Sequence, residues 1–376
     1  MQLQLVDIKS YRIAPQYLSL YRLLYCLCIM VFVGLPSYTW LSSDLNIFFN
    51  PPPYSIANIF NGFPPALFFK ILTLLNIIFF GLMFLGIYCR WTSIAFAITA
   101  IIGHNYCYSF GKIDHLLIWL IAPIFLSLAG WGNHFTIGSS KDKQNTTVNQ
   151  QDNSIYIIML AMTIAFSMFT SGVQKVLGGW QSWEAEAVRY HLIKKYYSLG
   201  SLDLLADYFM SIKNHLVWKF FDYSGLMLEL GFIFSIMRRK WFQVFLVGGT
   251  IFHILVLLMF NIPFYSNIIV YLVFINWDDI FKRFNYNFIT KSINGIKIAN
   301  YILVAGSCII LYWLYWFFTA GSIFIIPGVI DITDQKMLQS TSKTAMRLLF
   351  LSSFIVLVFC VTIAAFNRFK TKRINY

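Results

Sequence analysis

Charged residues are scarce in this chain. Only 11% of its 376 residues are Asp, Glu, Lys or Arg, whereas 59% are hydrophobic and the mean hydropathy is +0.67. Soluble domains carry about 25% charged residues, so the composition excludes an ordinary globular protein. Apolar runs recur from end to end, and a helix needs only about 20 such residues to cross a bilayer. The sequence therefore predicts an all-α fold, a polytopic helical membrane bundle.

Cysteine and histidine motifs are also lacking. The six cysteines form no CxxC pair, and the six histidines show neither HxxxH nor HExxH spacing. We therefore expect the cysteines to be small apolar residues of the bundle and expect no dedicated metal site.

Basic residues do outnumber acidic ones, which gives a net charge of +13. They lie in short clusters between the apolar runs, a pattern typical of cytoplasmic loops. No basic stripe with interleaved aromatic residues lies outside the runs, so we expect no nucleic-acid partner. The partner that the composition predicts is the lipid bilayer.

We count about ten spans by the length criterion. They cover approximately Leu18–Trp40, Ala66–Tyr88, Trp91–Tyr108, His115–Gly132, Ser154–Val176, Phe220–Met237, Trp241–Phe260, Tyr265–Trp277, Ile298–Phe324 and Leu348–Ala365. The eighth is short and is either tilted or re-entrant.

Lysine and arginine set the orientation. Their clusters, from Lys9/Arg12 to Arg368–Arg373, fall on one side if both termini do, and the positive-inside rule makes that side cytoplasmic. Leu41–Pro65 carries no basic residue and is expected on the opposite face, as a proline-rich extended surface loop. The predicted location is the cell membrane, multi-pass, with both termini cytoplasmic.

The longest extramembrane piece is Leu177–Lys219, which is predicted to be extracytoplasmic. Leu202, Leu204, Leu205, Tyr208 and Phe209 would line one face of an amphipathic helix there. That helix either lies on the outer membrane surface or forms a lid over a cavity. With this segment, residues 1–280 form one predicted domain, and residues 281–376 add two further spans and a basic tail.

One stretch, "FTSGVQKVLGGWQSW", places Lys175 at the outer end of the fifth span. Such a lysine commonly extends its amine toward the membrane surface. However, Gly172 and the Gly178/Gly179 pair allow backbones to approach closely, which suits an amine held between helices. Burial there would favour the neutral amine, which can act as a base. Both interpretations remain open at this stage.

Other ionisable groups lie within or beside predicted spans, where charge is unfavourable and usually faces the bundle interior. These groups are Arg22, His104, Asp114, His115, Asp222, Glu229 and His253. Glu229, in the middle of its span, is expected either to pair with a base or to stay protonated. A lone buried histidine such as His253 is more often a core residue than a catalyst.

Several of these stretches resemble the vitamin K-dependent gamma-carboxylases and the wider group of horizontally transferred transmembrane (HTTM) domains. The similar segments, within roughly Tyr17 to Trp277, are "SLYRLLYCLCIM" with Arg22, "NIFFNPPPYS", "LGIYCRWTSIAFAIT", "HNYCYS" with His104, "SGVQKVLGGW" with Lys175 and Trp180, and the segment around His253. The composition, rich in Phe, Ile, Asn and Lys, is typical of an AT-rich bacterial genome.

The resemblance implies a helical bundle with a cavity on the outer side. It implies catalytic roles for Lys175, His104 and His253. The residues expected around the cavity are Arg22, Asp114, His115, Trp180, Glu184 and Glu229. In the carboxylases the lysine would deprotonate a reduced quinone, so a quinone cofactor is possible by resemblance.

Three functions are compatible with these patterns. The first is a bacterial membrane enzyme that modifies or matures a peptide, or acts on a quinone, through a Lys/His site. The second is a non-catalytic membrane subunit, or an immunity or export partner of a secreted peptide. The third is a transporter that uses Asp222, Glu229 and His253 as a proton relay, and no pair of broken spans supports it.

Overall fold

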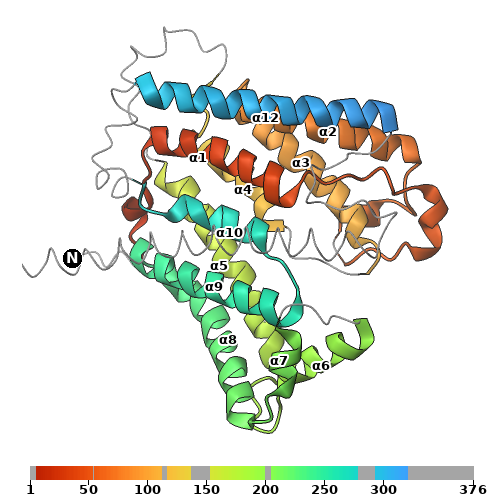
Figure 1. Ribbon diagram of the computed structural model, residues 1–376, viewed down its shortest axis with the longest axis vertical. Coiled ribbons are helices and arrows are strands. Elements are labelled where there is room, and N and C mark those ends of the chain that lie inside the picture. The colour runs from red at the N-terminus through yellow and green to blue at the C-terminus, as the bar shows by residue number, and fades with distance from the viewer. Residues whose placement is uncertain are drawn as a thin grey trace, which may run out of the picture. The chain divides into compact units, whose positions relative to one another are not determined.

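The computed structural model describes residues 6–53, 55–111, 117–136, 153–199, 205–277 and 293–320. This part of the chain is helical and contains no β-strand (Figure 1). Its elements are η1 (Ile8–Tyr11), α1 (Pro15–Cys28), η2 (Ile29–Val33), η3 (Ser43–Phe48), η4 (Ile56–Ile59), α2 (Ala66–Leu85), α3 (Cys89–Tyr108), α4 (Leu117–Leu128), α5 (Ser154–Leu177), α6 (Ala187–Leu199), α7 (Ala206–Ser211), α8 (His215–Ser235), α9 (Arg239–Phe260), α10 (Tyr265–Tyr271), η6 (Leu272–Phe274) and α12 (Ile293–Ala320).

Four of the described helical segments are long and apolar enough to cross a membrane. They are Pro15–Val33, Ala66–Leu85, Ser154–Leu177 and Arg239–Phe260. Shorter apolar helices cover Leu117–Leu128, Tyr265–Phe274 and Leu303–Tyr315. The expected all-helical architecture is therefore confirmed, whereas the number of ten spans stays a prediction.

Each of the first nine predicted spans overlaps one of the helices α1 to α5, α8 to α10 and α12, and the tenth, Leu348–Ala365, lies outside the described residues. The agreement is closest where a span has a marked end. For example, α2 begins directly after Pro64 and Pro65, and it ends at Gly86, whose φ of 78° needs the left-handed conformation that glycine adopts readily. Proline before the helix and glycine after it are sequence signals that predict both ends.

Contacts divide the chain into two compact units. The first consists of Met1–Leu18, Asp114–Trp131 and Ser139–Ile275. Within it, α5 packs along α8, which in turn packs against α9, and the short helices α6 and α7 lie beside the N-terminal part of α8 (Figure 1, green). Gly172 allows the close contact of α5 with α8, because a Cβ atom there would lie 3.1 Å from the Cβ atom of Glu229.

The second unit consists of Ser19–Ile113, Gly132–Gly138 and Asn276–Tyr376. Its helices α2 and α3 pack side by side, and α12 packs on α2. A hydrophobic cluster joins α2 and α3 to the residues between α1 and α2; its buried members are Tyr38, Leu41, Ala57, Phe63, Phe69, Leu72 and Tyr106.

Two expectations for the extramembrane segments are revised. Leu41–Pro65 is not simply extended, since it contains the short 3-10 helices η3 and η4. An amphipathic helix with its apolar side chains on one face was expected around residues 202–209, and from residue 205 on, where the structure describes the chain, this expectation was wrong. Here α7 begins only at Ala206, and it buries Phe209 while leaving Tyr208 exposed. The expectation failed because Phe209 packs into a cluster with Leu192, Trp218 and Met259, which are distant in the sequence.

Candidate functional site

Lys175, in the last turn of α5, forms an ion pair with Glu229 of α8. Its Nζ atom lies 2.6 Å from Oε1 and 2.5 Å from Oε2 of the carboxylate, and it also donates to Oγ of Ser171 over 3.1 Å. The Glu229 side chain is only 3% exposed, and that of Lys175 is 19% exposed. The expectation that Glu229 pairs with a base is therefore confirmed, and Lys175 is the base.

The pair lies level with the middle of α9. Gly225 of α8 lies against Phe252, and Gly231 lies against Phe245, so the two helices run antiparallel. Glu229 is between these two contacts, and the matching position on α9 is near Gly248. Glu229 is therefore far from both ends of α9, a helix apolar enough to cross a membrane, whereas Lys175 lies in the last turn of α5, another such helix. A buried carboxylate among such apolar helices is typical of functional sites.

One aromatic ring lies over the amine, and a second packs beside that ring. The indole of Trp180 lies 5.3 Å from Lys175 Nζ, within the range of a cation–π interaction. The ring of His191, on α6, lies 5.5 Å from the Trp180 ring. Burial lowers the pKa of His191 below its ordinary 6.5, and the charges of Lys194 and Lys175 lower it further, while Asp222 opposes the shift. A neutral imidazole beside Trp180 can accept a proton.

A second lysine holds the loop that carries Trp180. Lys219 of α8 is buried, and its Nζ atom donates to three backbone carbonyls, those of Trp180 (3.3 Å), Ser182 (2.8 Å) and Ala185 (2.8 Å). Asp222, one turn further along α8, lies 3.0 Å from the same amine. Its carboxylate also accepts from the backbone N–H groups of Ala187 and Val188, at the start of α6.

This arrangement satisfies backbone groups that have no partner in a regular helix. Carbonyls in an irregular loop and the first N–H groups of a helix need hydrogen bonds when they are buried. Lys219 supplies the donor and Asp222 the acceptor, so both ends of residues 180–188 are fixed to α8. Trp180 is thereby fixed near Lys175.

Beyond the loop lies a third charged group. Glu186 accepts from Arg189 (Nη1 to Oε2, 2.6 Å), and its Oε1 lies 2.8 Å from Nδ1 of His215. Burial of Glu186 disfavours its charged form. The hydrogen bonds and charges of Arg189 and His215 outweigh this effect, so the pKa of Glu186 is lowered from 4.5. Trp183 packs edge-on against His215, with 5.4 Å between ring centroids.

The expected site residues are distributed unevenly. The structure brings Lys175, Glu229 and Trp180 together, and it places Glu184 on the exposed side of the adjacent loop. His253 lies on α9 in an aromatic cluster, where its ring stacks on Phe264 at 4.4 Å and its Nε2 atom is 3.1 Å from the Tyr271 hydroxyl.

Arg22 and His104 belong to the second unit. Arg22 is fully buried; it donates to the carbonyl of Phe135 over 2.5 Å and lies 3.5 Å from the Cys89 thiol. His104 is buried, and its Nδ1 atom is 2.8 Å from the Tyr38 hydroxyl. Asp114 and His115 lie outside the described residues.

Sequence reasoning missed Ser171, His191 and Lys219 as parts of this site. A signal existed for Ser171, because a residue four positions before Lys175 lies on the same face of a helix. Lys219 and Asp222 are three residues apart, which is also a helical spacing. Nothing local in the sequence links His191 to Trp180. Among the described residues, no cluster of three or more His, Cys, Asp or Glu side chains could hold a metal ion.

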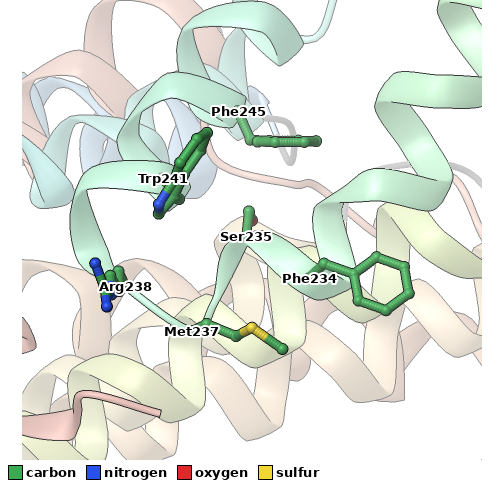
Figure 2. Close-up of a pocket in the computed structure, with 6 residues that line it drawn as sticks. All are labelled: Phe234, Ser235, Met237, Arg238, Trp241 and Phe245. Atoms are coloured by element: carbon green, nitrogen blue, oxygen red, sulfur yellow. The ribbon is translucent and has the colours of Figure 1, made fainter. Parts of the chain in front are cut away.

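An open pocket lies at the turn between α8 and α9 (Figure 2). It is lined by Phe234, Ser235, Met237, Arg238, Trp241 and Phe245. Its one hydroxyl, that of Ser235, donates to the backbone carbonyl of Phe232 over 2.6 Å. The lining is otherwise apolar except for Arg238, so it offers no group suited to acid–base chemistry.

No protein-family model, curated protein or solved structure matches the chain. The case for a functional site therefore rests on the geometry around Lys175.

Proposed function

We propose that this chain is a multi-pass protein of the bacterial cell membrane, with both termini cytoplasmic, that transfers a proton at Lys175. The substrate would be a molecule able to reach membrane depth, such as a lipid-soluble quinol or an apolar peptide. The observation that carries the proposal is the Lys175–Glu229 contact, which buries a carboxylate of α8 against the candidate span α5. The resemblance to the carboxylase and HTTM group supports the quinol.

Proton transfer needs a neutral amine, and Glu229 can provide one without a change in net charge. The proton moves from the Lys175 ammonium to the carboxylate, which leaves an amine beside a carboxylic acid. Such a neutral pair is favoured by apolar surroundings, because burial disfavours both charges. The amine then takes a proton from an O–H group of the substrate, and the new ammonium stays beside the substrate anion. Trp180 and Ser171 keep the amine in place during this exchange.

Replacement of Lys175 by alanine and by arginine tests the proposal. Arginine keeps the charge but cannot give up its proton, so it should fail as completely as alanine. The measurement is complementation of a deletion strain, with the amount of protein in the membrane held equal. Retained function in Lys175→Arg would contradict proton transfer.

A second measurement tests whether the Lys175 amine is neutral, and it needs no substrate. A neutral amine reacts with acylating reagents, whereas an ammonium does not. We expect a membrane-permeant acylating reagent to modify Lys175 in the intact protein, as detected by mass spectrometry. Glu229→Gln removes the proton acceptor, so it should lower this reactivity relative to that of Lys213, an exposed lysine before α8.

A second candidate function is supported by the surface beside the site. Trp183, Tyr190, Tyr197 and Tyr208 are each more than half exposed, which is typical of a surface that binds another protein. The chain would then be a non-catalytic partner of a secreted peptide. In that case Lys175→Arg would retain function, and replacing these four aromatic residues by serine would abolish it.

A further inference from the structure

Residues 40–53 and 55–65, which we call the α2-entry segment, form a fixed structure in the second unit (Figure 1, red to orange before α2). Leu41, Ala57 and Phe63 are buried in the cluster that includes Phe69 of α2 and Tyr106 of α3. The inner side of the segment is therefore anchored to the end of the α2–α3 pair where α2 begins and α3 ends.

Side-chain hydrogen bonds fix the rest of the segment. The Oδ1 atom of Asn105, on α3, accepts from the Ser55 hydroxyl over 2.8 Å and from the backbone N–H of Ile56 over 3.3 Å. Asn46 accepts from the backbone N–H of Phe63 over 2.6 Å. The orientation of the outer side chains is thus set by the fold and cannot change freely.

The larger exposed side chains are apolar, and smaller polar ones lie between them. The apolar ones are Trp40, Ile47, Phe48, Ile56, Ile59 and Phe60, and the polar ones are Ser43, Asp44, Asn46, Asn50, Asn58 and Asn61. Ile47 is 86% exposed and Ile59 is 78% exposed, values that are unusual for large aliphatic residues held in a fixed structure. Asp44 is the only charged residue between Trp40 and Pro65. Trp40 stacks on Phe110, with 5.6 Å between ring centroids.

This apolar surface continues onto a candidate membrane span. Helix α2 begins at Ala66, directly after the segment, and its exposed residues Leu67, Phe68 and Ile71 extend the surface along the helix. The first turn of a span lies at the membrane boundary, so a segment fixed to that turn lies there too. Aromatic residues with a polar edge, such as Trp40, are typical of this boundary.

We infer that the α2-entry segment is a lipid-binding surface, with Ile47, Ile59 and their neighbours inserted between the lipid headgroups and the upper acyl chains. The inference rests on the membrane insertion of α2 that the proposed function includes. The occupant is the bilayer itself, because the apolar surface is continuous with the outer face of α2. An amphipathic element of this kind buries its apolar side roughly 5–10 Å into the boundary.

The test places a fluorophore at single introduced cysteines in the full chain, after the partly exposed Cys28 and Cys107, the exposed Cys308, and Cys360 are replaced by serine. The variants are Ile47→Cys, Ile59→Cys, Ile78→Cys on the exposed face of α2, and Glu184→Cys as the exposed control. Each is labelled with an environment-sensitive dye and reconstituted into phosphatidylcholine vesicles. Some vesicles carry lipids with a nitroxide near the headgroup, and others carry it in the middle of the acyl chain.

We expect labels at residues 47 and 59 to show blue-shifted emission, and the shallow nitroxide to quench them more strongly than the deep one. The label at residue 78 should be quenched more strongly by the deep nitroxide, and the label at residue 184 should show neither effect. Water-like emission at 47 and 59, with deep quenching at 78, would overturn the inference but leave the membrane insertion intact.

Two other outcomes would also overturn the inference. Water-like emission at all four positions would contradict the membrane insertion itself, and the proposed function with it. Blue-shifted emission at 47 and 59 that neither nitroxide quenches would show that a second copy of the chain covers the surface.

Discussion

Two lysine–carboxylate pairs involve α8, and they differ in what else they contact. The Lys219 amine has four acceptors, of which three are backbone carbonyls, and Asp222 binds two backbone N–H groups. Among the described residues, the Lys175 amine contacts only side chains, those of Glu229, Ser171 and Trp180. The side chain of Lys219 is 2% exposed, whereas that of Lys175 is 19% exposed.

Under the proposed function, the difference separates a structural pair from the pair that takes part in proton transfer. A lysine ammonium has three N–H donors, and those of Lys219 are all used in holding the loop and Asp222. In the described part of the chain, no backbone group depends on the Lys175 pair. The variants below test this contrast, from the largest expected effect to the smallest.

Replacing Lys219 by methionine should have the largest effect on stability. The change keeps most of the side-chain volume but leaves Asp222 as an unpaired buried charge and removes the donor to three carbonyls. Loss of one partner of a buried pair costs about 3–5 kcal/mol. The measurement is thermal unfolding in detergent, followed by tryptophan fluorescence. Lys213→Met, at an exposed position before α8, is the matched control and should change little.

One outcome would contradict the prediction for Lys219→Met. If Lys219→Met unfolds at the temperature of the control, then the loop does not depend on the amine. The structural role assigned to the pair would then be wrong.

Glu229→Gln should destabilise the protein less than Lys219→Met. The amide keeps one acceptor for the Lys175 amine, and that amine is partly exposed, so the ammonium is not left wholly without solvation. We expect a loss of about 1.5–3 kcal/mol, the range for hydrogen bonds to charged groups. In the double variant with Lys175→Met, the losses should not add, because each single change removes the same contact. Additive losses would show that the two side chains act independently.

Part of the fold and part of the site around Lys175 could be predicted from the sequence. The composition predicts the helices, and the apolar runs locate α2, α5 and α9 within a few residues, because burial in lipid or protein requires long apolar stretches. The spacing of Gly172 and Lys175 indicates close helix packing near an amine. Glu229 is identified as needing either a base or a proton, because charge within an apolar helix is unfavourable.

The rest depends on contacts between distant residues. Lys175 and Glu229 are 54 positions apart, and no local pattern shows that α5 meets α8 at that point. The three carbonyls bound by Lys219 are backbone groups, which leave no signature in the side-chain sequence. His191, which packs on Trp180, was missed because no local pattern in the sequence links the two residues. The catalytic roles predicted for His104 and His253 followed from the family resemblance, and their fixed neighbours, Tyr38 and Phe264, appear only in the folded chain.

Glu186 provides a pH-dependent comparison with both pairs. Because its pKa is lowered in the folded protein, its contribution to stability is fully present above its ordinary pKa of 4.5 and is lost as the pH falls through the folded value. Glu186→Gln should therefore destabilise the protein by about 1 kcal/mol at neutral pH, and the difference from the unaltered protein should shrink below about pH 4.5. Unfolding at neutral and at acidic pH measures it. A difference that stays constant with pH would show that the contacts with Arg189 and His215 do not favour the carboxylate.

Ser171→Ala should have the smallest effect, and it sharpens the comparison most. The hydroxyl accepts from the Lys175 amine and donates to Oε1 of Glu229 over 3.4 Å, and Glu229 keeps both of its contacts with the amine when the hydroxyl is lost. We expect a destabilisation of about 0.5–1 kcal/mol, typical of one hydrogen bond at a partly exposed site. If Lys175 transfers a proton, the hydroxyl positions the amine without exchanging protons, so the variant should still complement a deletion strain while Lys175→Ala does not. A complete loss of function in Ser171→Ala, at normal abundance in the membrane, would show that the hydroxyl takes part in the transfer, and the two-residue mechanism would have to include it.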